Sequence, residues 1–190
     1  MPRIVDYEQV LEQMSAQRMK CLYHNSGSFG FHDGAAVQIC GWIGPEDASI
    51  RHEALAQARP APPPYEENLA RLFERAWTEL LPGPLWIMPA SHWAYELEFG
   101  NADWMPAALR EIKIDSADLQ FRNNGAAIEF EMNESANASQ FVERLLEHLA
   151  GSDFTLAFPG KPVICTLHHH KQLWWQAIDP TLINELRRLL

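Results

Sequence analysis

P-V-I-C-T-L-H-H-H-K-Q-L-W-W-Q-A-I, residues 162–178, joins the most apolar strand pattern of the chain to three histidines and two tryptophans. Side chains alternate between the two faces of a strand. Alternation predicts a core face formed by Val163, Cys165, Leu167 and Trp175. It predicts a second face formed by His168, His170, Gln172 and Trp174. A turn at the histidines would give two strands, but glycine, asparagine and proline are missing there, so one long bent strand is the alternative.

Outward from this stretch, short strand patterns and amphipathic helix patterns follow one another along the chain. We expect strands over 21–25, 29–32, 35–43, 85–88, 93–99 and 154–158, a hairpin over 118–131, and helices over 6–20, 64–81, 103–112, 137–149 and 180–190. Segment 45–59 is ambiguous, with a short helix over 48–58 as one interpretation. The R-P-A-P-P-P run predicts a stiff, extended connector over 59–64, because proline fixes the backbone.

These patterns indicate the fold class. Short strand-to-strand connections favour antiparallel pairing. Alternating strands predict that one face of the sheet is solvated. We therefore predict a single α+β domain over residues 1–190, with the connector 59–64 inside it. Its mainly antiparallel sheet carries helices packed mostly on one face and is built from repeated strand–strand–helix units.

Composition excludes several classes of function. The 190 residues carry a net charge of −10 and no basic patch, so we expect neither nucleic acid nor an anionic membrane as a partner. An acidic surface instead favours a basic protein partner or a cation. Three cysteines without a C-x-x-C pair argue against a disulfide framework and a zinc ribbon. With no signal-like or membrane-spanning segment, we expect a cytoplasmic protein with reduced thiols.

The histidines give the first candidate site. On a continuous strand His168 and His170 point the same way and could share a divalent metal, for which imidazole is a suitable ligand. The pattern does not specify a third ligand. The alternative interpretation is a polar strand end or turn.

A second candidate site lies around Ser91, His92 and Trp93, followed by Glu96 and Glu98. A histidine with paired carboxylates can perform acid–base chemistry. On a strand over 93–99 the two glutamates would share one face, opposite Trp93. The alternative is an ordinary solvated sheet face.

Residues 26–30 read S-G-S-F-G, and their G-S-F-G core resembles part of the glycine-rich loop of protein kinases. The resemblance covers four residues. The chain has no lysine between Lys20 and Lys113 and no H-R-D or D-F-G, so we interpret the segment as a hairpin turn. Cys165 lies in an apolar run and is expected to be a core thiol.

No complete catalytic set is present, so we favour a non-catalytic binding or regulatory protein over an enzyme, with a basic protein surface as its partner. One alternative is a metal-dependent hydrolase that uses histidines and glutamates, and another is a small-ligand domain with an aromatic-lined pocket. No cofactor is predicted beyond a divalent metal. The candidate binding residues are Trp174, His168, His170, Trp93, Glu96 and Glu98, and the candidate metal ligands are His168 and His170.

Overall fold

The computed structural model describes residues 1–45, 56–120 and 125–190. The strands of its main sheet are β1 (Arg3–Val5), β4 (Gln38–Ile43), β5 (Ala58–Pro60), β6 (Leu85–Pro89), β7 (Ala127–Phe130), β8 (Phe154–Ala157), β9 (Val163–His168) and β10 (Gln172–Ala177). Among the described residues they form an eight-stranded sheet in the order β1-β7-β6-β8-β9-β10-β4-β5. Neighbours are antiparallel except β4 and β5, which are parallel. The chain is thus a single-domain α+β fold with a large, mostly antiparallel sheet, as predicted.

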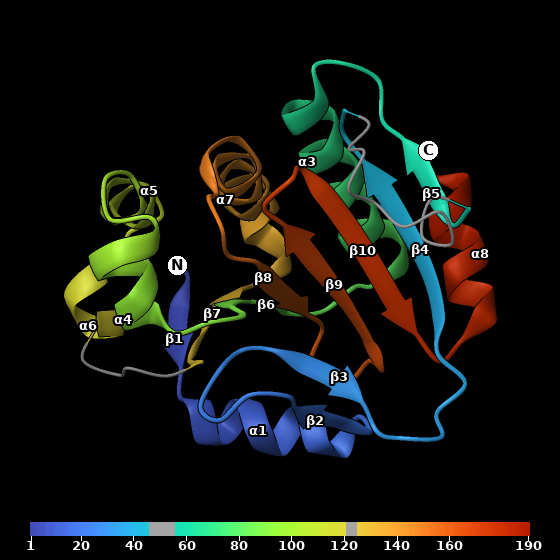
Figure 1. Ribbon diagram of the computed structural model, residues 1–190, viewed down its shortest axis with the longest axis horizontal. Helices are drawn as coiled ribbons and strands as arrows, with labels where there is room; N and C mark the ends of the chain where they lie inside the picture. The colour runs from blue at the N-terminus through green and yellow to red at the C-terminus, as the bar shows by residue number, and fades with distance from the viewer. Residues whose placement is uncertain (46–55, 121–124) are drawn as a thin grey trace.

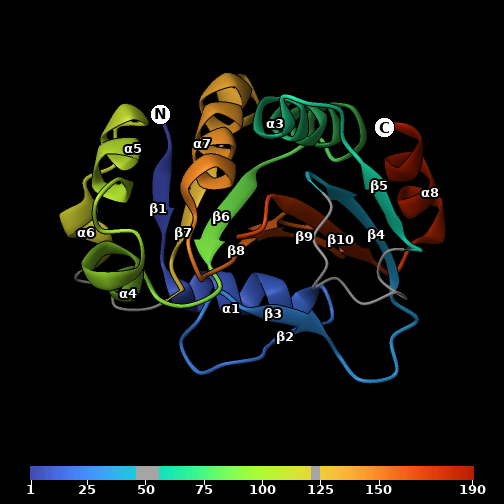
Figure 2. The ribbon, with the colours of Figure 1, turned by 45° about the horizontal axis from the view of Figure 1, so that its top comes forward.

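Helices cover one face of this sheet, and a helix with a small hairpin covers part of the other (Figures 1 and 2). The first group is α3 (Tyr65–Arg75) with the π-helical turn η1 (Ala76–Leu80), α7 (Ser135–His148) and α8 (Pro180–Arg188). The second group is α1 (Tyr7–Ala16) with the antiparallel pair β2 (Met19–Cys21) and β3 (Phe29–Phe31). Short helices lie beyond the β1 edge: α4 (Trp93–Tyr95), η2 (Glu96–Gly100), α5 (Met105–Glu111) and α6 (Ser116–Gln120). The 3₁₀ turn η3 (Met132–Glu134) leads into α7.

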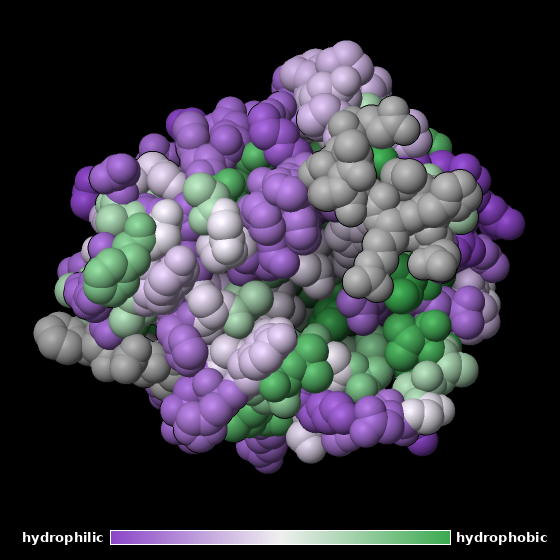
Figure 3. All heavy atoms as spheres, in the orientation of Figure 1, coloured by the Kyte–Doolittle hydropathy of each residue, from purple (hydrophilic) through white to green (hydrophobic). Residues whose placement is uncertain are grey.

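The core has two parts, one on each face of the sheet. Under α3 and α7, the ring of Trp175 stacks on Phe73 at 6.1 Å and on Phe158 at 5.9 Å between centroids. On the opposite face, Val10 of α1 belongs to a buried cluster with Trp86 of β6. The expectation of one solvated sheet face is therefore wrong for this half of the sheet, where α1 and the small hairpin bury it. Figure 3 shows hydrophilic residues over the helices at the top of the molecule and hydrophobic residues gathered lower down.

The stretch 162–178 is a hairpin and not one bent strand. Gln172 pairs with His168, and Ala177 with Val163. The turn closes through Lys171, whose φ of 59° lies in the left-handed region. The core face is confirmed, because Val163, Cys165, Leu167 and Trp175 are all buried.

Two further expectations are wrong. Residues 93–99 are helical, because Trp93 and Leu97 are four residues apart and bury one side of a helix, while Phe99 is 74% exposed. The hairpin over 118–131 is instead α6 followed by the single strand β7. Repeated strand–strand–helix units are consequently not confirmed within residues 1–45, 56–120 and 125–190. The short helix considered for 48–58 falls largely on 46–55, outside the described residues.

The other long elements agree with their patterns. Helices expected over 64–81, 137–149 and 180–190 are α3 with η1, α7 and α8. In the described residues, no helix has both the length and the apolar character needed to cross a bilayer.

Candidate metal and ligand site

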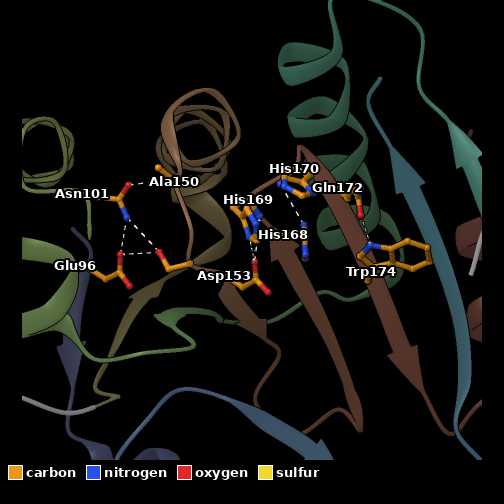
Figure 4. Close-up of polar contacts among 10 residues, drawn as sticks. Glu96, Asn101, Ala150, Asp153, His168, His169, His170, Gln172 and Trp174 are labelled. Atoms are coloured by element: carbon orange, nitrogen blue, oxygen red, sulfur yellow. Dashed lines mark hydrogen bonds and ion pairs between the residues drawn. The ribbon is translucent and has the colours of Figure 1, made fainter. Parts of the chain in front are cut away.

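The β9–β10 turn brings three imidazole rings together. One ring nitrogen of each of His168, His169 and His170 lies within 4.8 Å of the others. His168 and His169 stack with their centroids 4.3 Å apart, and His170 meets both rings edge-on. His170 is exposed and the other two are half-buried. Figure 4 shows the three rings side by side at the end of the hairpin.

Asp153, just before β8, holds the central histidine. Its Oδ1 accepts a hydrogen bond from the backbone N–H of His169 at 3.1 Å and lies 2.9 Å from His169 Nδ1. In the neutral ring, an Nδ1–H that donates to Asp153 leaves Nε2 with a free lone pair. His169 is thus set to accept a proton or a metal at Nε2.

An ion pair joins the same turn to α3. Lys171 Nζ donates to Glu66 Oε1, and this hydrogen bond lowers the pKa of the Glu66 carboxyl. Glu66 lies in the first turn of α3, where negative charge suits the helix dipole. The turn is therefore tied to β8 on one side and to α3 on the other.

A buried carboxylate lies across from the histidines. Glu96 is 0% exposed and accepts hydrogen bonds from Ser91 Oγ, from Ser152 Oγ at 2.9 Å and from Asn101 Nδ2 at 2.5 Å. Asn101 Oδ1 in turn accepts from Trp104 Nε1 at 3.0 Å. Figure 4 shows Glu96 and Asn101 of this network on its left. Glu96 opens the π-helical turn η2, and π-turns are rare and frequent at functional sites.

A cavity of about 310 Å³ lies between the carboxylate network and the histidine turn. Its volume is at the lower end of ligand-binding clefts. Its lining residues are Ala90, Ser91, Tyr95, Gly151, Ser152, Asp153 and His169. The cavity therefore touches both the Asp153–His169 pair and the hydroxyls bound to Glu96.

The structure separates most of the residues expected to act together. Trp93 is buried, and its Nε1 donates to the carbonyl of Ala126 at 2.6 Å, so it offers no exposed surface to a partner. Glu98 is exposed on η2 and accepts from Gln120, whereas Glu96 points into the network. His92 reaches the carbonyl of His24 instead of a glutamate.

Trp174 is half-buried on the sheet face that alternation predicted for it. Its Nε1 donates to Gln172 Oε1 at 2.8 Å. The indole lies against Gly41 of the neighbouring strand, where an added Cβ would come within 2.4 Å of the ring. Glycine at this position lets the ring lie flat on the sheet.

Sequence reasoning found His168 and His170 but missed His169, Asp153, Ser152 and Asn101. Alternation placed His169 on the far face, yet alternation ends where a strand turns, and all three rings then converge. The H-H-H run was the signal that could have included His169. Asp153 and Ser152 carried no signal, because they join the site only through the pairing of β8 with β9.

Comparisons of this chain with protein-family models, with curated proteins and with solved structures found no match.

Proposed function

We propose that this protein binds a divalent transition-metal ion through the imidazoles of His168, His169 and His170. The observation that carries the proposal is the convergence of three ring nitrogens within 4.8 Å. Imidazole is a preferred ligand of zinc, copper and nickel. The net charge of −10 also favours a cation as the bound species.

The ligands are close to, but not at, bonding geometry. With zinc about 2.0–2.1 Å from each nitrogen, tetrahedral ligands lie about 3.4 Å apart. The rings must therefore draw together by about an ångström, which for His170 is a movement of an exposed side chain. His169 needs little movement, since Asp153 already fixes its ring.

Asp153 supports the site from behind. Ligating histidines commonly donate their other ring N–H to a carboxylate, which fixes the ring and increases its basicity. The 2.9 Å contact between His169 Nδ1 and Asp153 Oδ1 has this arrangement. Three protein ligands leave a fourth position for water, as in open zinc sites.

Zinc titration of protein purified without a histidine tag tests the proposal, with a chromophoric chelator as competitor. We expect one equivalent to bind at pH 8 and affinity to fall at pH 5, because protons compete for imidazole. His169→Ala and His170→Ala should each weaken binding at least about tenfold, and Asp153→Asn about 10–100-fold.

His32→Ala is the matched control, because His32 is an exposed histidine beside the small hairpin. It should leave the affinity unchanged. Zinc binding that survives both His169→Ala and His170→Ala would overturn the proposal, as would the absence of any stoichiometric binding.

The basic protein partner stays a prediction from charge, and metal-dependent hydrolysis stays a prediction from composition. Neither Glu96 nor Glu98 belongs to the histidine cluster. The alternative of a small-ligand binding site is considered below for the cavity beside the histidine turn.

A further inference from the structure

We infer that the cavity beside the histidine turn binds a small organic amine in its ammonium form. This site goes beyond the metal proposal and uses different atoms. Its lining includes Ser91, Ser152, Asp153 and Tyr95.

The serine hydroxyls that line the cavity act as hydrogen-bond acceptors because both are bonded to the buried carboxylate of Glu96. Ser91 and Ser152 both donate their hydroxyl hydrogens to Glu96. A serine hydroxyl has one hydrogen and two lone pairs. Ser152 Oγ also accepts from Asn101 Nδ2 at 3.3 Å, which uses one of its lone pairs. With the hydrogens committed to Glu96, the lone pairs that remain are all that the two serines can offer a ligand, so both present acceptors to the cavity.

Asp153 adds a charged acceptor. Its Oδ1 receives both bonds from His169, while Oδ2 accepts no hydrogen bond within the described part of the chain. The side chain is 30% exposed and lines the cavity. An ammonium group has three donors and no acceptor, so it complements this set of oxygens.

Other ligand classes fit less well. Among the described residues that line the cavity there is no lysine or arginine, so a carboxylate or phosphate would face the Asp153 carboxylate without a fixed positive charge. A neutral alcohol can donate one hydrogen bond but gains nothing from the charge of Asp153. The half-exposed ring of Tyr95 adds an aromatic surface, which favours cations.

The amine and the metal would interact through their charge. Both are cations placed around the Asp153–His169 pair, so each should weaken binding of the other by the same factor. The amine site nevertheless does not need the metal, and it is tested on metal-free protein.

The probe is butylammonium, titrated into the EDTA-treated full chain and followed by ¹H–¹⁵N correlation spectra. We expect saturable shifts of the amides of Ser91, Gly151, Ser152 and His169. Pentan-1-ol and butyrate, of similar size but neutral and anionic, should bind at least about tenfold more weakly.

Asp153→Asn keeps an oxygen for His169 but removes the charge, and it should weaken butylammonium at least about tenfold. Glu12→Gln makes the same charge change at an exposed position of α1 and should have no effect. Equal shifts from the three probes, or none that saturate, would overturn the inference.

His170→Ala separates the two proposals. His170 is not among the lining residues of the cavity. The variant should bind zinc at least about tenfold more weakly and should keep its affinity for butylammonium. Loss of amine binding in this variant, with an unchanged amide spectrum elsewhere, would contradict a separate ligand site.

Discussion

The histidine cluster depends on a tight turn, and that turn depends on the unusual backbone conformation of Lys171. Lys171 takes a left-handed conformation that most side chains avoid, and this closes the turn without glycine or asparagine. Its side chain then reaches Glu66, so the same residue bends the chain and anchors the bend. The sequence showed that a conventional turn residue was missing but not that a lysine would replace it.

Glu66→Gln should lower the free energy of unfolding by about 0.5 kcal/mol at pH 7, the range of partly exposed ion pairs. Because the pair lowers the pKa of Glu66, its contribution is present above the ordinary glutamate value and is lost as pH falls through the lowered one. The difference from wild type should therefore shrink below about pH 4.5.

Urea denaturation across this pH range measures the effect. A double-mutant cycle with Lys171→Met separates the ion pair from the loss of negative charge at the start of α3. A destabilisation that is the same at pH 7 and pH 3 would show that the pair is not its cause.

At the scale of elements, periodicity identified the long amphipathic helices and the strand character of 162–178, but it left open whether that stretch is a hairpin or one bent strand. It failed where two periodicities fitted one segment. In residues 93–99 alternate positions are apolar, but Trp93 and Leu97 also satisfy a helix, and the buried Glu96 fits neither amphipathic pattern. Burial of Glu96 depends on Ser152 and Asn101, and the pattern of 93–99 contains neither residue.

The helix start of α8 provides a local test. Asp179 Oδ1 accepts from the backbone N–H of Thr181 at 2.8 Å and caps the helix. Asp179→Ala should reduce the free energy of unfolding by about 1 kcal/mol, because that N–H loses its partner. Asp179→Asn, which can also cap, should retain nearly all of the stability in thermal or urea unfolding. Equal destabilisation by both substitutions would contradict a capping role.

At the scale of the whole molecule, part of the sheet is packed on both faces, which the alternation in single strands did not reveal. A strand with polar side chains at alternate positions can have those side chains exposed to solvent. The same pattern also occurs when the polar side chains are buried beneath another helix or hairpin. Thr155, for example, is buried on β8, although its side chain is polar. Which half of the sheet α1 covers depends on how the chain connects its elements. The residue pattern of a single strand does not predict that connection.

The reactivity of the three cysteine thiols provides a test of this packing. Cys40 and Cys165 are fully buried in strands on either side of Trp175, and burial raises the pKa of Cys40 to about 12 and that of Cys165 well above its ordinary value. Only Cys21 is partly exposed. At pH 8 a thiol reagent should modify one cysteine in the native protein and three in denaturant.

Cys21→Ser should leave no reactive native thiol. Rapid reaction of all three thiols in the native state would mean that the sheet opens locally around Trp175 and would contradict the packing described.

The strand order has a consequence for biosynthesis. β4 (residues 38–43) pairs with β10 (residues 172–177), and β1 pairs with β7. Neither β4 nor β1 can form these pairs until the later strand has been synthesised. β1 and one edge of β4 therefore emerge from the ribosome long before the strands that they pair with, although β4 can already pair with β5. Contacts this distant in sequence slow folding and leave apolar strands exposed in the meantime. The native sheet can close only after residues 172–177 have been synthesised, so a chain truncated before β10 would leave one edge of β4 unpaired and exposed to aggregation.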